Sequence, residues 1–236
     1  MKTILVTGGS KGIGKALVFE AALNNYNIIF TYNKSTKEAK KICNKLKDKC
    51  TAIKVNLALE KDRAKLFNYL KKKKINIDCL VNNAAYDVKR KKFRNIKLSE
   101  IRKIYEVNLF SVYDLINRSI KFMKKKGHWK SIINLSSTAA KFGGQNFTHY
   151  APTKAAIENL TIGLSKELTK EKIRVVCVAP GIIDTKIENR KNKKIISTIP
   201  NLRLGTPEEV AKLIIWLASD QAEYINGTTV TISGGR

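Results

Sequence analysis

The amino-acid sequence predicts an α/β fold: a single-domain, doubly wound, seven-stranded parallel sheet flanked by helices. Short apolar runs alternate with segments of helical periodicity along all 236 residues. The runs are continuous, as at residues 131–135, which is typical of parallel strands buried on both faces. A glycine-rich turn directly follows the first run. Such a fold places its ligand site at the carboxyl ends of the strands.

The predicted strands are short apolar runs that alternate with the helical segments. They are expected at residues 3–7, 28–32, 51–55, 78–82, 131–136, 173–178 and 228–232. The segments between them carry apolar residues three or four positions apart, which indicates helices. These helices are expected at 12–24, 36–47, 60–73, 98–125, 149–169 and 206–218. Capping boxes are predicted at Ser35 with Glu38 and at Thr206 with Glu209.

Composition restricts the class of protein. With no Pro/Ser-rich linker and no internal repeat, residues 1–236 are predicted to form one domain. No apolar run approaches the ~18 residues of a membrane span, and the N-terminus does not have the pattern of a signal peptide. The four cysteines form no Cys-x-x-Cys pair and only two histidines are present, which argues against a zinc site or a disulfide scaffold. We therefore expect a cytoplasmic protein with reduced thiols.

The charge is strongly positive: 46 lysines and arginines face 19 acidic residues, a formal net charge of +27. Such a field attracts nucleic acid, anionic membrane surfaces, acidic carrier proteins or phosphorylated substrates. The lysines are spread over predicted helix surfaces, so an ordinary solvated basic surface explains them equally well. We expect neither a specific nucleic-acid partner nor membrane association.

The turn after the first strand reads Thr7-Gly8-Gly9-Ser10-Lys11-Gly12-Ile13-Gly14. Glycines allow positive φ and let backbone N–H groups approach a pyrophosphate at a helix N-terminus. The turn also approaches the phosphate loop of nucleotide triphosphatases, but Ala16 stands where that loop needs a magnesium-binding hydroxyl. A purely structural tight turn is the alternative. The sequence therefore predicts dinucleotide binding by a Rossmann fold, through Gly8, Ser10, Lys11, Gly12, Ile13 and Gly14.

The adenosine ribose is expected at the end of the second strand. An NAD site usually places an acid there, but this sequence offers Asn33, Lys34 and Ser35, with Lys11 nearby. A lysine suits the nearly dianionic 2′-phosphate of NADP(H), which a carboxylate would repel. We therefore predict NADP(H) rather than NAD(H); the alternative is that Lys34 belongs to the general lysine excess.

A Tyr-x-x-x-Lys pair, Tyr150 and Lys154, lies at the start of a predicted helix, and this spacing places both side chains on one helix face. A nearby cation favours the ionised form of a phenol, which suits it for proton exchange. Alone, such a pair is explained equally well as a helix-surface contact. Ser137 after the fifth strand, Asn108 in the fourth predicted helix and the glycine turn make it a candidate catalytic pair.

Together these motifs resemble the short-chain dehydrogenase/reductase family over essentially the whole chain. The family's glycine motif, its Asn-Asn-Ala-Gly motif (here residues 82–85) and its active-site tetrad are recognisable. The resemblance implies Asn108, Ser137, Tyr150 and Lys154 as catalytic residues. It implies further cofactor contacts from Asn56, Leu57, Asn83, Ala84, Ala85, Pro180, Gly181, Ile183 and Thr185, besides Tyr150 and Lys154.

By that resemblance, Tyr150 protonates the alkoxide formed from a carbonyl, and Ser137 donates a hydrogen bond to the substrate oxygen. Lys154 would bind the nicotinamide ribose, and Asn108 would position Lys154 through a water. Two departures from the family pattern stand out. Ala85 replaces a glycine, at a cost of about 1 kcal/mol if that position needs positive φ or a close backbone approach. Asn56 replaces an acid near the adenine, which we expect to weaken or alter adenine recognition.

Lysine-rich loops at about 86–97 and 186–204 are expected to surround the substrate. Within the family, the run 199–208 most resembles 3-oxoacyl-[acyl-carrier-protein] reductases, and an acidic carrier protein would suit a basic rim. A sugar, nucleotide-sugar or other small ketone substrate is the alternative, as is a non-catalytic dinucleotide- or polyanion-binding protein. The family also implies a homodimer or homotetramer formed through the helices at 98–125 and 149–169. The apolar residues there (Leu109, Phe110, Ile157, Leu160, Leu164) line either that contact or the core.

Overall fold

The computed structural model describes residues 1–86, 88–123, 127–185 and 193–236. One parallel seven-stranded sheet has the order β3-β2-β1-β4-β5-β6-β7, which confirms the doubly wound Rossmann fold. Its strands are β1 (Thr3–Val6), β2 (Asn27–Tyr32), β3 (Cys50–Lys54), β4 (Cys79–Asn82), β5 (Lys130–Leu135), β6 (Ile173–Pro180) and β7 (Thr229–Ile232). The strand order changes direction between β1 and β4, where such folds bind ligands.

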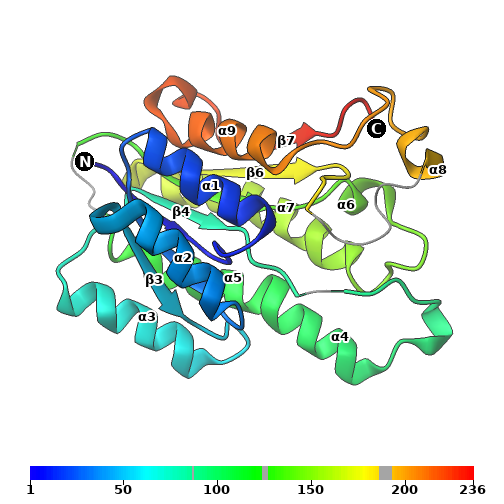
Figure 1. Cartoon of the computed structure of the whole chain (residues 1–236), viewed down its shortest axis with the longest axis horizontal. Helices are drawn as coiled ribbons and strands as arrows, with labels where there is room; N and C mark the ends of the chain where they lie inside the picture. The colour runs from blue at the N-terminus through cyan, green and yellow to red at the C-terminus, as the bar shows by residue number, and fades with distance from the viewer. Residues whose placement is uncertain (87, 124–126, 186–192) are drawn as a thin grey trace.

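Helices cover both faces of the sheet (Figure 1). On one face pack α1 (Gly12–Leu23), α2 (Thr36–Leu46) and α9 (Pro207–Ala218). On the other pack α3 (Glu60–Lys72), α5 (Ser111–Ile120) and α7 (Ala151–Leu168), and α4 (Leu98–Tyr105) leads into α5. The arrowheads of β4 and β6 point towards the side of the molecule that carries α6 (Ala139–Phe142) and α8 (Lys193–Ile196).

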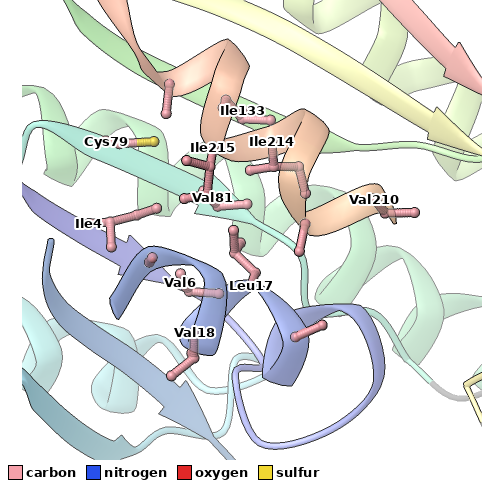
Figure 2. Close-up of a cluster of buried hydrophobic side chains, with 14 of the residues drawn as sticks. Ile4, Val6, Leu17, Val18, Cys79, Val81, Ile133, Val210, Ile214 and Ile215 are labelled. Atoms are coloured by element: carbon pink, nitrogen blue, oxygen red, sulfur yellow. The ribbon is translucent and has the colours of Figure 1, made fainter. Parts of the chain in front are cut away.

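Successive side chains along each strand point to opposite faces of the sheet and pack into two separate cores. Ile4 and Val6 pack with α1 and α9 in one core, whereas Leu5 between them belongs to the core beneath α3, α5 and α7. Figure 2 shows the first core, in which Leu17 of α1 and Ile214 of α9 lie over the sheet. Most positions of the central strands therefore face one core or the other, which explains their continuous hydrophobic runs.

Two details of the predicted helices are wrong. The helix expected at 98–125 is divided into α4, a π-helical turn (Glu106–Phe110) and α5, which ends at Ile120. The box at Ser35 does not form, because the Ser35 backbone (φ −89°, ψ 59°) lacks the extended conformation from which an N-cap side chain reaches the first turn. The box at Thr206 and Glu209 is confirmed, with both reciprocal hydrogen bonds present.

Within the described ranges, no helix combines the length and apolar character needed to cross a bilayer.

Candidate active site

All predicted site segments that the structure describes lie at one edge of the sheet, because every strand is parallel. The glycine turn follows β1, Asn33 to Ser35 follow β2, and Asn56 and Leu57 follow β3. Asn83 to Ala85 follow β4, Ser137 follows β5, and Gly181 follows β6, whose last residue is Pro180. Residues distant in sequence are thereby gathered at the edge where such folds bind ligands.

The glycine turn is tightly packed against its surroundings. Gly8 (φ +69°) and Gly12 (φ +51°) use the left-handed backbone region that favours glycine. A Cβ on Gly14 would lie 2.3 Å from the Gly8 carbonyl oxygen and 2.5 Å from Asn83 Nδ2. A Cβ on Gly12 would lie 3.2 Å from Thr185 Cγ2, so the loops after β1 and β6 meet here. The bare backbone at the start of α1 is the kind of cradle that a pyrophosphate needs, and the residues present fit a dinucleotide.

Hydrogen bonds fix the turn to its neighbours. Asn83 Nδ2 donates to the Thr7 carbonyl (2.8 Å), and the N–H groups of Asn83 and Ala84 both donate to Thr7 Oγ1 (3.0 Å each). The Gly8 N–H donates to Thr31 Oγ1 at 3.2 Å. Thr7 and Thr31 were not predicted as site residues. The available signals were that Thr7 directly precedes Gly8 and that Thr31 lies near the end of β2.

The remaining turn residues differ in exposure. Ser10 is buried, Ile13 packs partly into the core beneath α1, and Lys11 is exposed. Asn33 and Lys34 are also exposed and Ser35 is half-buried, at the tip of β2.

Asn56 and Ala85 are residues at which the sequence departs from the family pattern. The Asn56 side-chain oxygen accepts the Ala58 N–H (3.2 Å), so one of its lone pairs is engaged within its own loop. The neighbouring Leu57 is buried. Ala85 is exposed and does not have positive φ, so the position needs no glycine for its backbone conformation.

Ser137, Tyr150 and Lys154 surround the carboxyl end of β5. The buried Lys154 Nζ donates to the Leu135 carbonyl at 2.6 Å and lies 5.7 Å from the centroid of the Tyr150 ring. Ser137 Oγ accepts the Ala139 N–H (3.2 Å), which orients the hydroxyl at the start of α6. Among the described residues, Lys154 forms no ion pair. Burying an unpaired cation costs free energy, and such groups cluster at functional sites. This burial therefore supports a functional role for Lys154.

Asn108 connects three elements. It lies in the π-helical turn and is almost fully buried. Its Nδ2 donates to Thr153 Oγ1 (3.3 Å) and its Oδ1 accepts the Tyr86 N–H (2.8 Å). Thr153 in turn donates to the Tyr150 carbonyl at 2.7 Å. The side chain of Asn108 thus joins the start of α7 to Tyr86, which follows residues 82–85. That Asn108 positions Lys154 through a water stays a prediction.

Glu158 lies one turn beyond Lys154 on α7, and Ser136 Oγ donates to its carboxylate at 2.7 Å. Cys177 of β6 lies near both charged groups, and burial raises the pKa of its thiol to about 12, so the thiol is neutral there. Thr153 and Glu158 were not predicted as site residues; their positions three and eight residues after Tyr150, respectively, were the available signal.

Residues 88–97, in the predicted substrate loop after β4, are hydrogen-bonded to the segment just before Tyr150. The Lys91 N–H donates to the Asn146 carbonyl (3.0 Å), and His149 Nε2 donates to the Lys89 carbonyl (3.2 Å). The Arg90 guanidinium carbon lies 4.8 Å over the Phe147 ring, whose centroid is 5.6 Å from that of Tyr150. The Phe147 ring therefore lies between the Arg90 guanidinium and Tyr150, the candidate proton donor.

The second loop lies partly outside the described residues, which resume at 193. Thr185 precedes the gap, and its N–H donates to the carbonyl of the buried Ile183 (2.9 Å). Further along, Arg203 Nη2 donates to Glu209 Oε1 at 2.6 Å, and this bond lowers the pKa of Glu209 to about 2. This ion pair joins the loop to the start of α9.

Comparison with known proteins agrees with these features. A family model described as Enoyl-(Acyl carrier protein) reductase matches residues 8–236. The uncharacterized oxidoreductase YgfF of Escherichia coli is 31% identical, and the match covers 100% of both chains. The 3-oxoacyl-[acyl-carrier-protein] reductase FabG of Aquifex aeolicus is 32% identical over 99% of this chain and 96% of the relative.

Solved structures agree as well. The 3-ketoacyl-(acyl-carrier-protein) reductase of Brucella melitensis, complexed with NADH, has a TM-score of 0.92 at 28% identity, covering 100% and 98% of the two chains. A blue fluorescent protein from a metagenomic library, in complex with NADPH, has a TM-score of 0.92 at 25% identity, covering 99% and 97%. The chain belongs to the short-chain dehydrogenase/reductase family of oxidoreductases.

Proposed function

We propose that residues 1–236 form one NADP(H)-binding domain that reduces a carbonyl group to a secondary alcohol. The observation that carries this proposal is the buried Lys154 ammonium, held at 2.6 Å by the end of β5 and 5.7 Å from the Tyr150 ring. It keeps a positive charge beside the phenol, which favours transfer of the phenolic proton to a forming alkoxide.

The other residues of the site have separate roles in binding and catalysis. Ser137 donates a hydrogen bond to the substrate oxygen and stabilises the charge that develops there. Lys154 also binds the hydroxyls of the nicotinamide ribose, and Asn108 fixes the start of α7 through Thr153. The backbone of Ile183, with Thr185, Pro180 and Gly181, binds the carboxamide in this proposal. The dinucleotide, when bound, supplies the hydride.

The substrate that the site favours is a 3-oxoacyl thioester on a carrier protein. Several relatives are named for that reaction, and Arg90 stands near Tyr150 on a loop rich in lysine and arginine. Acidic carrier proteins associate readily with basic rims. NADPH oxidation with 3-oxoacyl and 2-enoyl thioesters, sugars, ketones and quinones tests this. We expect turnover of the 3-oxoacyl substrates; turnover of the 2-enoyl thioester alone would replace carbonyl reduction by alkene reduction.

The cofactor preference rests on Lys34. No acid follows β2, and the exposed Lys34 and Lys11 form no ion pair within the described part of the chain, so both are available to the 2′-phosphate. We expect Lys34→Ala to weaken NADPH binding about tenfold, or ~1.4 kcal/mol, and to leave NADH binding unchanged. Titration of protein fluorescence by each dinucleotide measures this. Lys41→Ala, which removes an exposed charge further along α2, is the control; equal losses in both variants contradict a specific contact.

A homo-oligomer, dimer or tetramer, is proposed through α4, α5 and α7. Ile157 belongs to the protomer core, and Leu109, Leu160 and Leu164 pack partly against that core. Phe110 of the π-helical turn is 53% exposed and Tyr113 of α5 is 52% exposed, so both are available for a contact between subunits. We expect Phe110→Asp to produce monomers in analytical ultracentrifugation, whereas Phe142→Asp, at a more exposed phenylalanine on α6 (67%), does not. A wild-type protein that is monomeric at micromolar concentration would contradict the proposal. A cytoplasmic location stays a prediction.

A further inference from the structure

Two cysteines that no sequence spacing connects lie side by side at the edge of the sheet opposite the candidate active site. Cys43 of α2 and Cys50, the first residue of β3, have their sulfur atoms 3.6 Å apart. A disulfide bond is about 2.05 Å long, so the two sulfurs are in van der Waals contact and must approach further by about 1.5 Å to form one. Both thiols are free and half-buried, whereas Cys79 and Cys177 are buried in the core.

Cys50 also lines a cavity of about 560 Å³ at the amino ends of the strands. This volume lies within the range of small-molecule sites. Lys49, Lys74 and Lys130 line it together with Asp48 and Asp78. Asp78 is already paired with Lys130 (2.9 Å) and with His128 (3.1 Å), and accepts the Thr3 N–H (2.7 Å). The cavity therefore presents excess positive charge next to a thiol.

We propose that Cys43 and Cys50 are a redox-active dithiol, oxidised by an anionic low-molecular-weight disulfide that enters this cavity. The Cys50 thiolate attacks one sulfur of the disulfide, forming a mixed disulfide and releasing one thiolate. The Cys43 thiolate then attacks Cys50 Sγ and displaces the second thiolate. In total, two protein thiols are oxidised to one disulfide, and one small disulfide is reduced to two thiols.

The charge of the cavity matters because only a small fraction of Cys50 is in the attacking thiolate form. Burial and the neighbouring Cys43 raise the pKa of Cys50, so little thiolate exists at neutral pH. Lysines around the opening offset this by concentrating anions at the thiol. The inference does not depend on the proposed carbonyl reduction.

Oxidised glutathione, which is anionic, and cystamine, which is cationic, test the proposal on the reduced full-length protein. We expect oxidised glutathione to remove two thiols and to give a Cys43–Cys50 cross-linked peptide in mass spectrometry, reversed by dithiothreitol. Cys79 and Cys177 should stay free. Cys43→Ser should stop at a mixed disulfide on Cys50. Absence of the cross-link, or modification of all four cysteines together, overturns the dithiol.

Rates test the role of the cavity. At low salt we expect oxidised glutathione to react about three- to tenfold faster than cystamine, and the difference to shrink at high salt. Lys49→Gln with Lys74→Gln should slow the glutathione reaction by a similar factor. Lys166→Gln with Lys170→Gln, which removes the same charge from the α7 side, should not. Cystamine reacting as fast as glutathione, or equal slowing by both pairs, overturns the anionic oxidant.

Discussion

Replacing Tyr150 by phenylalanine is expected to lower kcat for 3-oxoacyl thioester reduction by about 10²–10⁴-fold, the usual contribution of a general acid. The variant loses one hydroxyl and keeps the ring that packs 5.6 Å from Phe147. Lys154, held by the Leu135 carbonyl, should stay in place. NADPH affinity should therefore change little while turnover falls. Steady-state NADPH oxidation, with dinucleotide binding measured in parallel, provides both quantities.

The matched control is Tyr69→Phe, which removes a hydroxyl from α3 and should leave kcat at the wild-type value. Equal turnover by Tyr150→Phe and the wild-type protein would contradict the role of Tyr150 as proton donor. A parallel loss of NADPH binding would instead assign Tyr150 to holding the cofactor.

Gly14→Ala is expected to disable the glycine turn. The new Cβ would lie 2.3 Å from the Gly8 carbonyl oxygen and 2.5 Å from Asn83 Nδ2, closer than such atoms can approach. The clash with the Gly8 carbonyl requires a shift of α1 or of the turn itself, and the clash with Asn83 also disturbs its hydrogen bonds to Thr7 and Gly8. We expect a loss of about 1–3 kcal/mol in the free energy of unfolding, as for other overpacked sites, and at least about tenfold weaker NADPH binding.

Chemical denaturation and NADPH titration measure the two effects of Gly14→Ala. Lys15→Ala changes the next residue of the same helical turn, where the side chain is exposed, and should alter stability by less than about 0.5 kcal/mol. Wild-type stability together with wild-type NADPH affinity in Gly14→Ala would show that the turn does not need its bare backbone.

The strands could be predicted from the sequence because burial on both faces leaves a continuous signal. Residues such as Leu5, between Ile4 and Val6, must be apolar for the core on the opposite face. The same reasoning could not foresee the π-helical turn at Asn108. Apolar spacing averages over a helix and does not reveal a single turn with wider hydrogen bonding. The short helices α6 and α8 contain too few residues to show periodicity.

The candidate site could be predicted only as far as residues cluster in sequence or match a motif. Tyr150 and Lys154 share a helix, and their spacing showed it. Contacts between distant segments have no such signal. Arg90 over Phe147 depends on how one loop lies against another, and the Cys43–Cys50 approach depends on how α2 packs on β3. Both follow from packing, which periodicity does not encode.

The loop after β4 has a further consequence for redesign. Three tethers fix its course: the Tyr86 N–H to Asn108, the Lys89 carbonyl to His149 and the Lys91 N–H to Asn146. Each uses the loop's main chain, so these hydrogen bonds do not depend on the identity of the Arg90 side chain. If this loop contacts the substrate as proposed, a library at Arg90 is expected to change which molecule is admitted while Tyr150 and Lys154 keep their positions.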